Sequence, residues 1–329
     1  MASVGGNSLP LSEKARIEAY IPDLPQQAYQ HLLDALAQEF SYSKAGLHIM
    51  NDARHNFYLR PKKRFGQHFL TSSTVLNGIL RLAELTPEDV VVEIGAGTGT
   101  LTEALASRVG RLLALELDRD LIAPLRQRFG GRPHVEIVHA DALTFDWDQV
   151  PAPIKVVANL PYGTAVAILL RLFNERSRLR CAVIMLQREV AERLYARPST
   201  KAYGSLTLLT QWHASVEKGF HVPPSAFSPP PKVMSTVVRI IPRSAPPVTV
   251  QDDACLFRII HAAFAQRRKT LANALRHEFQ LIEPAILRQT LENSGIIPSR
   301  RGETLTLDEF ARLSNALQRI WPIPRKDNS

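Results

Sequence analysis

The stretch VVVEIGAGTG, residues 90–99, decides the fold of this chain. Its apolar first half is typical of a buried strand. The glycines that follow, Gly95, Gly97 and Gly99, let the backbone approach a ligand closely, and a helix that starts after them offers it free N–H groups. Thr100 stands where the G-x-G-x-x-G dinucleotide fingerprint requires its last glycine, so the spacing is G-x-G-x-G. The stretch predicts a strand, a nucleotide-type cofactor loop and a helix; a plain strand–helix turn is the alternative.

On both sides of this stretch, short apolar runs alternate with helix-like segments from Lys62 to Arg243. Such alternation indicates an α/β fold, a parallel sheet with helices on both faces. Two further apolar runs, near 212–220 and 233–241, have no helix pattern between them, which indicates an antiparallel hairpin at the sheet edge. The expected strands are 90–94, 111–116, 135–139, 154–158 and 181–186, and the expected helices are 73–84, 100–108, 119–129, 165–174 and 188–196.

The pattern divides the chain into three parts. Residues 61–245 form the expected α/β domain, and Pro246-Pro247 begins a linker-like stretch after it. Residues 1–60 are an extension whose apolar spacing after Pro25 predicts one amphipathic helix, and Met50 is an alternative start. The last part, 246–329, is expected to be a small all-helical domain with helices at 253–265, 267–279, 284–293 and 307–319.

The composition indicates which kinds of partner and compartment the protein has. The 329 residues carry a net charge of +9, most of it within 61–245, and such an excess favours a polyanionic partner, nucleic acid first. The two cysteines, Cys181 and Cys255, have no metal-binding spacing, so we expect no metal and a reducing, cytoplasmic compartment. We expect no membrane association and no secretory signal, because no apolar run approaches the roughly 20 residues that span a bilayer.

Two acidic residues strengthen the cofactor prediction. Glu116 ends the strand after the glycine loop, where a carboxylate can accept hydrogen bonds from both ribose hydroxyls. Asp141 follows the next strand, and its carboxylate can accept a hydrogen bond from the amino group of a cofactor adenine. An exposed strand-end charge and a turn-forming aspartate are the alternatives. Because the carboxyl ends of successive strands meet at one sheet edge, the coincidence of the three elements is more specific than any of them alone.

The tetrapeptide Asn159-Leu160-Pro161-Tyr162 follows the fourth expected strand. The Asn159 side-chain carbonyl and the Leu160 main-chain carbonyl can accept both hydrogens of an adenine N6 amine, while Pro161 rigidifies the turn. Tyr162 offers a face on which a flipped-out base can stack. With the cofactor loop, this set indicates methyl transfer from S-adenosylmethionine to an adenine amino group; a strand that ends in a turn with Tyr162 in the core is the alternative.

A proline-rich segment supplies one more aromatic residue. Pro229-Pro230-Pro231 would fix the ring of Phe227 at the rim of the site, opposite Tyr162. A hydrophobic plug is the alternative interpretation.

The motifs together resemble those of the ribosomal RNA adenine N6,N6-dimethyltransferases, the universal small-subunit dimethylase family. The similarity covers about 61–320, in family order. The resemblance implies a Rossmann-like S-adenosylmethionine-dependent methyltransferase domain with a small helical C-terminal domain. It implies dimethylation of two adjacent adenosines in the 3′-terminal hairpin loop of small-subunit (16S) rRNA during ribosome biogenesis. The segments that carry it are 63–70 (KRFGQHFL), 93–99 (EIGAGTG), 159–162 (NLPY), 227–233 (FSPPPKV) and 264–271 (FAQRRKTL).

The resemblance also implies site residues. Target-binding residues would be Asn159, Leu160, Pro161, Tyr162 and Phe227, and cofactor-binding residues would be His68, Leu70, Gly95, Gly97, Glu116, Asp141 and Asn159. Two positions depart from the family pattern: His68 stands where many relatives have asparagine, and 163–166 read GTAV where many have NIST.

Basic residues near the motifs are candidates for RNA binding. Arg64 and Lys232 flank the expected site, and Arg267, Arg268 and Lys269 would bind phosphate from the helical domain in a salt-dependent way. A solvated helix face is the alternative for the last three. Residues 201–204 (KAYG) are expected in a mobile loop.

Three functions compete. The leading one is small-subunit rRNA dimethylation by a monomer that binds immature small ribosomal subunits. The first alternative is a large-subunit rRNA adenine dimethylase of the antibiotic-resistance branch, which often has isoleucine in place of Leu160. The second is a ribosome-assembly factor with little turnover, against which the intact Glu116, Asp141, Asn159 and Tyr162 argue.

Overall fold

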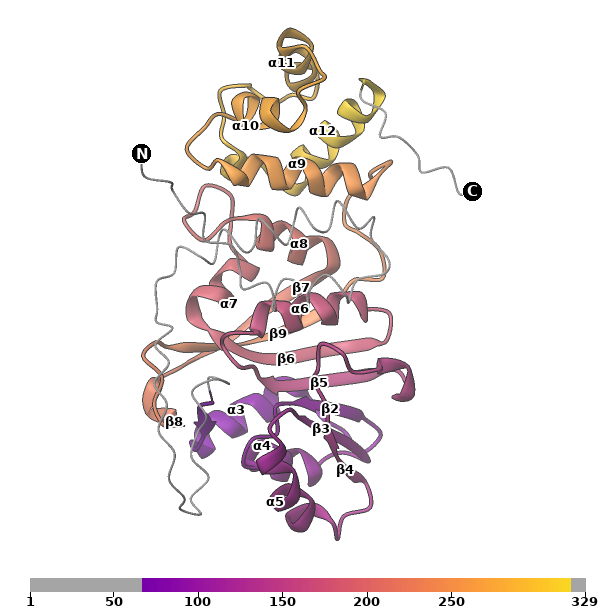
Figure 1. The fold of residues 1–329 in the computed structure, drawn as a ribbon, viewed down its shortest axis with the longest axis vertical. Helices are drawn as coiled ribbons and strands as arrows, with labels where there is room; N and C mark the ends of the chain where they lie inside the picture. The colour runs from indigo at the N-terminus through magenta and orange to yellow at the C-terminus, as the bar shows by residue number, and fades with distance from the viewer. Residues whose placement is uncertain (1–66, 321–329) are drawn as a thin grey trace, which may run out of the picture. The chain divides into compact units, whose positions relative to one another are not determined.

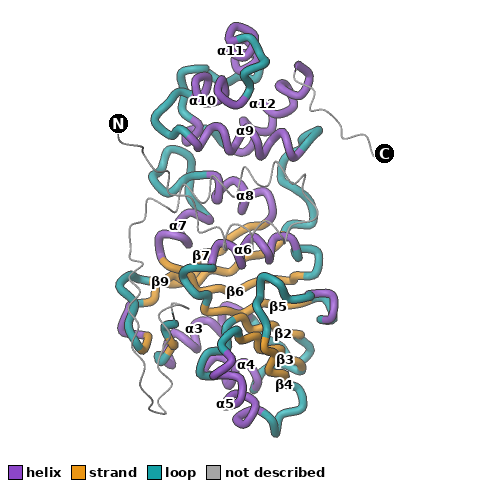
Figure 2. The backbone as a smooth tube through the Cα atoms, viewed as in Figure 1, coloured by secondary structure: helices purple, strands orange, loops and turns teal. Residues whose placement is uncertain are grey.

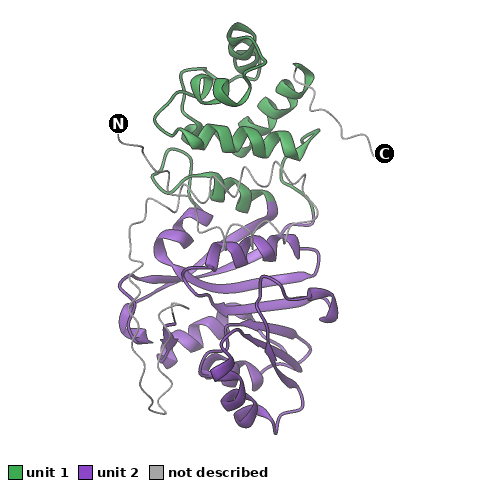
Figure 3. Cartoon of the chain, in the orientation of Figure 1, with its two compact units in different colours: residues 1–48, 196–212, 245–329 green, residues 49–195, 213–244 purple. Residues whose placement is uncertain are grey.

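The computed structural model describes residues 67–320. The expected N-terminal helix, Met50 and Arg64 lie outside the described residues. The chain divides into two compact units, drawn in different colours in Figure 3. The larger unit comprises, of the described residues, 67–195 and 213–244, and the smaller one 196–212 and 245–320. Residues 196–212, which the sequence pattern assigns to the α/β domain, thus group with the C-terminal helices.

A seven-stranded sheet forms the centre of the larger unit (Figures 1 and 2). Five strands are parallel, and the last two in the order, β9 and β7, pair antiparallel. This confirms the five expected strands and the antiparallel pair at the edge. In sheet order the strands are β4 (Val135–His139), β3 (Arg111–Glu116), β2 (Val90–Ile94), β5 (Ile154–Asn159), β6 (Leu179–Gln187), β9 (Ser235–Pro242) and β7 (Ala214–Val222).

The direction of the chain across the sheet determines where the helices lie. From β2 the chain moves outward to β3 and β4, and from β5 it moves the opposite way to β6. Because such crossovers are right-handed, the helices of the two halves cover opposite faces. The helices of the first half are α3 (Ser73–Ala83), α4 (Thr100–Ala106) and α5 (Arg119–Phe129), and those of the second half are α6 (Ala165–Asn174) and α7 (Arg188–Leu194).

The strand order reverses between β2 and β5, which are neighbours in register from Val90↔Ile154 to Ile94↔Ala158. Open α/β sheets bind ligands outside the carboxyl ends of the strands at such a switch point. The glycine loop follows β2 and the Asn159 turn follows β5. The topology therefore brings the two most informative motifs to the same place.

A two-stranded ribbon joins the start of the larger unit to its end. The strand β1 (Phe69–Leu70) pairs antiparallel with β8 (Phe227–Ser228), with Leu70 opposite Phe227. The Thr71 amide also donates to the Ala226 carbonyl at 2.9 Å. Neither strand was expected from the sequence, because two residues give no periodic signal.

A buried ion pair ties α3 to the sheet. Lys155 on β5 contacts Asp89 with Nζ and Oδ2 2.8 Å apart, and both side chains are almost fully buried. The ammonium also donates to the main-chain carbonyls of Ala83 and Glu84 at the end of α3. Burial alone would raise the pKa of Asp89, but hydrogen bonds from Lys155 and from the Thr86 amide hold it below its usual value.

The smaller unit is helical. Its helices are α8 (Ser205–His213, of which residues 205–212 belong to this unit), α9 (Asp253–Ala265), α10 (Leu271–Glu278), α11 (Pro284–Asn293) and α12 (Leu307–Ile320). The four expected C-terminal helices are present, but α10 starts at Leu271 instead of residue 267. The helix α8 was not expected.

Candidate active site

The glycine loop has the backbone conformation that its glycines predict. Gly95, Gly97 and Gly99 all have positive φ, between 57° and 81°. A Cβ on Gly97 would lie 3.1 Å from the Phe69 ring, and one on Gly99 would lie 2.8 Å from the Phe129 ring. Larger residues at these positions would therefore meet both a strained backbone and a steric conflict. The loop leads directly into α4, whose N-terminus has no side-chain cap.

Glu116 is held by the backbone of this loop. One carboxylate oxygen accepts from the Gly97 amide and the other from the Asp118 amide, both at 2.8 Å. The side chain is buried. A carboxylate offers about four acceptor positions, so this arrangement leaves capacity for the two hydroxyls of a ribose.

Asp141 lies where the sequence places it, just after β4. Its Oδ1 accepts from the Leu143 amide at 3.0 Å, which makes a local turn, and the side chain is partly exposed. The Ala140 amide donates to the Glu116 carbonyl at 3.1 Å, so the ends of β3 and β4 are tied together. The structure thus brings Gly97, Glu116 and Asp141 to one edge of the sheet.

Glu93 is a buried acid that no motif in the sequence marks as functional. Its side chain is fully buried on β2, directly before the glycine loop, and neither carboxyl oxygen has a hydrogen-bond partner. Burial raises the pKa of Glu93 to about 8, and the Glu116 carboxylate adds to the rise. The amide and hydroxyl of Thr102 lower the pKa of Glu93 by less than burial raises it, because the Thr102 hydroxyl does not reach hydrogen-bond geometry. The only signal in the sequence was an acidic residue within an apolar strand.

The Asn159 turn is fixed through the main chain and the amide. The Asn159 Nδ2 donates to the His68 carbonyl at 3.0 Å, which leaves Oδ1 as an acceptor for a ligand. The Leu160 amide donates to the Met185 carbonyl at 3.2 Å, and its side chain is buried. The Pro161 carbonyl accepts from the Thr164 amide, which closes the turn before α6.

Tyr162 is half-buried and held at two places. Its hydroxyl lies 2.7 Å from the Ser235 hydroxyl on β9, and its ring centroid lies 5.5 Å from that of His68 at an interplanar angle of 33°. Burial raises the pKa of Tyr162. The alternative interpretation has Tyr162 in the core, but the ring, which follows β5, is partly exposed. Ser235 was missed because nothing in its local sequence marks it.

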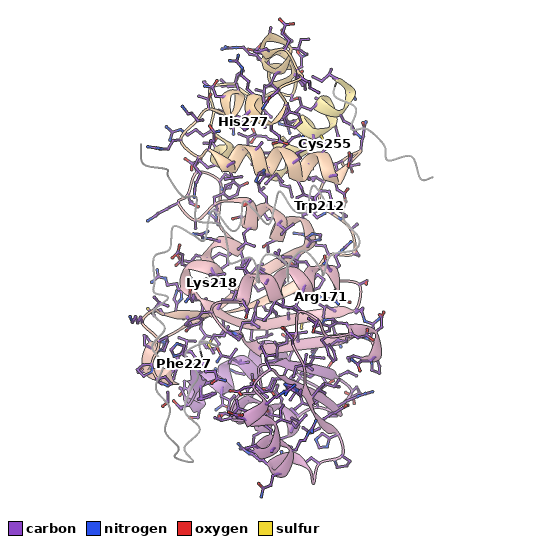
Figure 4. The ribbon with its side chains drawn as sticks, viewed as in Figure 1. Arg171, Trp212, Lys218, Phe227, Cys255 and His277 are labelled. Atoms are coloured by element: carbon purple, nitrogen blue, oxygen red, sulfur yellow. The ribbon has the colours of Figure 1, made fainter. Side chains whose placement is uncertain are left out.

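Two residues that are expected to bind ligands, Phe227 and Leu70, have buried side chains. The Phe227 side chain is only 4% exposed and belongs to the apolar cluster beneath α3 and α4, with Leu70, Val75 and Ala226 (Figure 4 labels Phe227 near β8). The expectation of a ring open at the rim is therefore wrong, and the plug alternative describes its position. Leu70 is 5% exposed in the same cluster, so its side chain is not available to a cofactor. The pairing of β1 with β8 buries both residues together.

The basic residues differ in their surroundings. Arg267 donates to the main-chain carbonyls of Lys201 and Tyr203 and pairs with Glu303 at 3.1 Å, all within the smaller unit. Tyr203 is fully buried and donates to the Leu305 carbonyl, so the mobile loop expected at 201–204 is instead anchored. The other candidates within the described residues, Lys232, Arg268 and Lys269, are exposed.

The residues of the larger unit fit S-adenosylmethionine. Three glycines give the loop after β2 its left-handed conformation, a held carboxylate stands at the end of β3, and the unpartnered Glu93 carboxyl lies directly before the loop. Glu116 and Asp141 supply acceptors for a ribose and an adenine amine. Within 67–320, no group of three histidine, cysteine, aspartate or glutamate side chains is placed to hold a metal ion, and both cysteines are free and buried. No helix in that range combines the length and hydrophobicity required to cross a bilayer.

Comparisons with known proteins show the family of this chain. The family model of the ribosomal RNA adenine dimethylases matches residues 58–319. A Geobacillus protein named Ribosomal RNA small subunit methyltransferase A is 42% identical over 269 residues, which cover 79% of this chain and 92% of the relative. The protein of the same name from Moorella thermoacetica is also 42% identical, over 79% of this chain and 93% of that relative.

Solved structures agree with the fold. A dimethyladenosine transferase from Plasmodium falciparum superposes with a TM-score of 0.64 at 26% identity and covers 75% of this chain and 96% of its own. The 23S rRNA methyltransferase ErmE superposes with a TM-score of 0.59 at 26% identity over 76% of this chain and 99% of its own. The expected Rossmann-like methyltransferase fold with C-terminal helices is thereby confirmed. On the match of motifs, fold and sequence, this chain belongs to the ribosomal RNA adenine dimethylase family.

Proposed function

We propose that this protein transfers methyl groups from S-adenosylmethionine to N6 of two adjacent adenosines in the 3′-terminal hairpin loop of small-subunit rRNA. The observation that carries the proposal is the orientation of the Asn159 amide. Its nitrogen is occupied by the His68 carbonyl at 3.0 Å, so its oxygen is the atom left to accept an N6 hydrogen. This acceptor stands at the switch point of the sheet, beside the glycine loop.

S-adenosylmethionine supplies a methyl group on a positively charged sulfur, which becomes a neutral thioether when the methyl leaves. Gly95 and Gly97 would hold it at the loop, Glu116 at its ribose and Asp141 at its adenine. The family resemblance also assigns His68 and Leu70 to the cofactor. The Leu70 side chain is buried, so a contact from Leu70 would come from its main chain.

The target amine is a poor nucleophile, because its lone pair is delocalised into the purine ring. Asn159 Oδ1 and the Leu160 carbonyl would accept its two hydrogens and so turn the lone pair toward the methyl group. Tyr162 would stack on the base. The proton can leave after transfer, so orientation supplies most of the rate, and effective molarities for such positioning reach about 10⁵–10⁸ M.

The partner that we propose is the immature small ribosomal subunit in the cytoplasm, bound by a monomer. The net charge of +9 and the exposed Lys232, Arg268 and Lys269 support a polyanionic partner, and Arg64 is a further candidate. The relatives that are named for the small subunit support the choice of RNA. The fold alone would also fit a large-subunit enzyme, because ErmE shares it.

The test uses labelled S-adenosylmethionine with small subunits that lack the dimethyladenosines, followed by nucleoside mass spectrometry. Intact large subunits are the control. We expect dimethyladenosine in the small-subunit RNA alone, and Asn159→Ala to abolish it while RNA binding persists. Label only in large-subunit RNA would favour the resistance branch. Tight subunit binding without label would favour an assembly factor.

A further inference from the structure

The Tyr162 side chain reaches across the sheet to a strand that is not a neighbour of its own. Tyr162 follows β5, whereas its hydroxyl lies 2.7 Å from the hydroxyl of Ser235, the first residue of β9. In the sheet, β6 stands between these two strands. The phenol therefore bridges the carboxyl end of β6, at the same edge of the sheet where Asn159 ends β5.

Ser235 is fixed by the sheet on both sides. It lies opposite Gln187 on β6 and opposite Val222 on β7. Its side chain is fully buried. A buried hydroxyl on a strand that is paired along both edges can shift little, so Ser235 is a firm point of attachment for the phenol.

The turn that carries Tyr162 gives its ring less support than the sheet gives Ser235. Gly163 comes next in the turn, and a Cβ at that position would have no atom within 4 Å. The Tyr162 side chain is itself partly exposed. A tyrosine ring is oriented by two torsion angles, and a contact at the hydroxyl, its far end, restrains both. The contact with Ser235 therefore restrains the plane on which a base would stack.

We propose that Ser235 is a positioning residue for methyl transfer: it acts through the Tyr162 hydroxyl and keeps the phenol ring at the angle that the target base requires. This inference rests on the proposed function, because it requires an adenine stacked on Tyr162. Ser235 itself would touch neither the base nor the cofactor, since its side chain is buried. Its contribution to the rate would be to exclude ring orientations in which the amine misses the methyl group, and a misplacement of about 1 Å can cost roughly 100-fold.

A double-mutant cycle separates this role from a general effect on the fold. Ser235→Ala removes the point of attachment, Tyr162→Phe keeps the ring and removes its hydroxyl, and the double variant removes both. Thr236→Val is the matched control, because it removes the buried hydroxyl of the next residue on β9, which lies 2.9 Å from His221 Nδ1. Successive side chains of a strand point to opposite faces, so this hydroxyl lies away from the Tyr162 contact.

The experiment measures kcat and KM of the full-length protein for small subunits that lack the dimethyladenosines. Calorimetry with S-adenosylhomocysteine gives the fraction of binding-competent protein in each preparation, and kcat is scaled to that fraction. We expect Ser235→Ala and Tyr162→Phe each to lower kcat about 3- to 10-fold, roughly the factor that one hydrogen bond contributes. The KM should stay within about twofold, because phosphate contacts supply most of the affinity for RNA.

The double variant gives the decisive comparison. If Ser235 acts through the phenol hydroxyl, the double variant should be no more than about twofold slower than either single variant, because all three lose the same contact. A merely structural effect of Ser235→Ala would instead persist when the Tyr162 hydroxyl is already absent. Thr236→Val should keep the kcat of the wild type.

Three results would overturn the inference. The first is a loss in the double variant equal to the product of the two single losses, because Ser235 would then act independently of the Tyr162 hydroxyl. The second is an undiminished kcat in Ser235→Ala, and the third is a loss that disappears once kcat is scaled to the binding-competent fraction. Wild-type label only in large-subunit RNA would overturn the proposed substrate alone, and the same cycle on that RNA would decide the inference. A wild type that labels no RNA would end both proposals.

Discussion

Replacement of Glu93 by glutamine should stabilise the ligand-free protein, and increasingly so as the pH rises. The carboxyl is fully buried without a hydrogen-bond partner, and burial raises its pKa from 4.5 to about 8. The folded protein therefore keeps a proton that the unfolded chain has lost between these two values. The free energy of unfolding is unaffected by this group well below pH 4.5, falls as the pH rises toward 8, and is constant above it.

The magnitude follows from the shift. A raised pKa of about 8 makes the wild type lose about 4 kcal/mol of stability between pH 5 and pH 9, relative to a side chain that does not titrate. Glu93→Gln lacks this loss, so its advantage over the wild type should grow by about that amount.

Urea unfolding followed by circular dichroism at pH 5, 7 and 9 measures the difference. Glu136→Gln, which removes an exposed carboxyl on β4, is the matched control and should follow the wild type. A difference between Glu93→Gln and the wild type that stays within about 1 kcal/mol at all three pH values would refute the reasoning, because Glu93 would then titrate alike in both states.

Three further predictions concern packing and charge. Lys155→Met leaves a carboxylate buried beside it and should lower the free energy of unfolding by about 3–5 kcal/mol in urea titrations. Gly97→Ala, with φ at +57° and the Phe69 ring close by, should cost about 1–2 kcal/mol and abolish detectable cofactor binding by calorimetry, whereas Gly131→Ala, which has open space, should bind normally. Arg268→Ala should reduce the slope of log affinity for RNA against log salt by about 1 without a change in melting temperature, and Arg267→Ala should lower the melting temperature instead. Equal effects of the two arginine variants on stability would contradict the structural role of Arg267.

The sheet was predictable because its signals are local. Each parallel strand is a short apolar run, and the glycine loop fixes where the first one ends. The helix α8 was missed because Leu206, Leu208 and Leu209 are all buried, so its sequence shows no amphipathic spacing, and Thr207 and Thr210 weaken the helical signal.

The start of α10 was misjudged for a tertiary reason. The pattern from residue 267 is helical, but Arg267 turns to bind two carbonyls of a distant loop and Glu303, and the regular helix begins only at Leu271. No property of residues 267–270 shows that such partners exist.

In the candidate site, too, some residues could be predicted from the local sequence and others could not. Asn159, Glu116 and Tyr162 could be identified because each ends a predicted strand within a motif. The partner of the Tyr162 hydroxyl, Ser235, lies 73 residues along the chain, and the partner of the His68 ring lies 161 residues away. Contacts at such separations leave no local trace in a sequence.

The ribbon of β1 and β8 has a consequence for the synthesis of the enzyme. The cofactor loop and its acidic partners lie within residues 93–141, which leave the ribosome early and need only neighbouring strands. The Asn159 turn, which would hold the base, donates to the His68 carbonyl, and the His68 ring is held by Pro229, so a loop of 161 residues must close first. During translation, a nascent chain would thus complete its cofactor pocket well before it could bind an adenine. Until the larger unit is fully folded, the surrounding ribosomal RNA would encounter an enzyme without a target site.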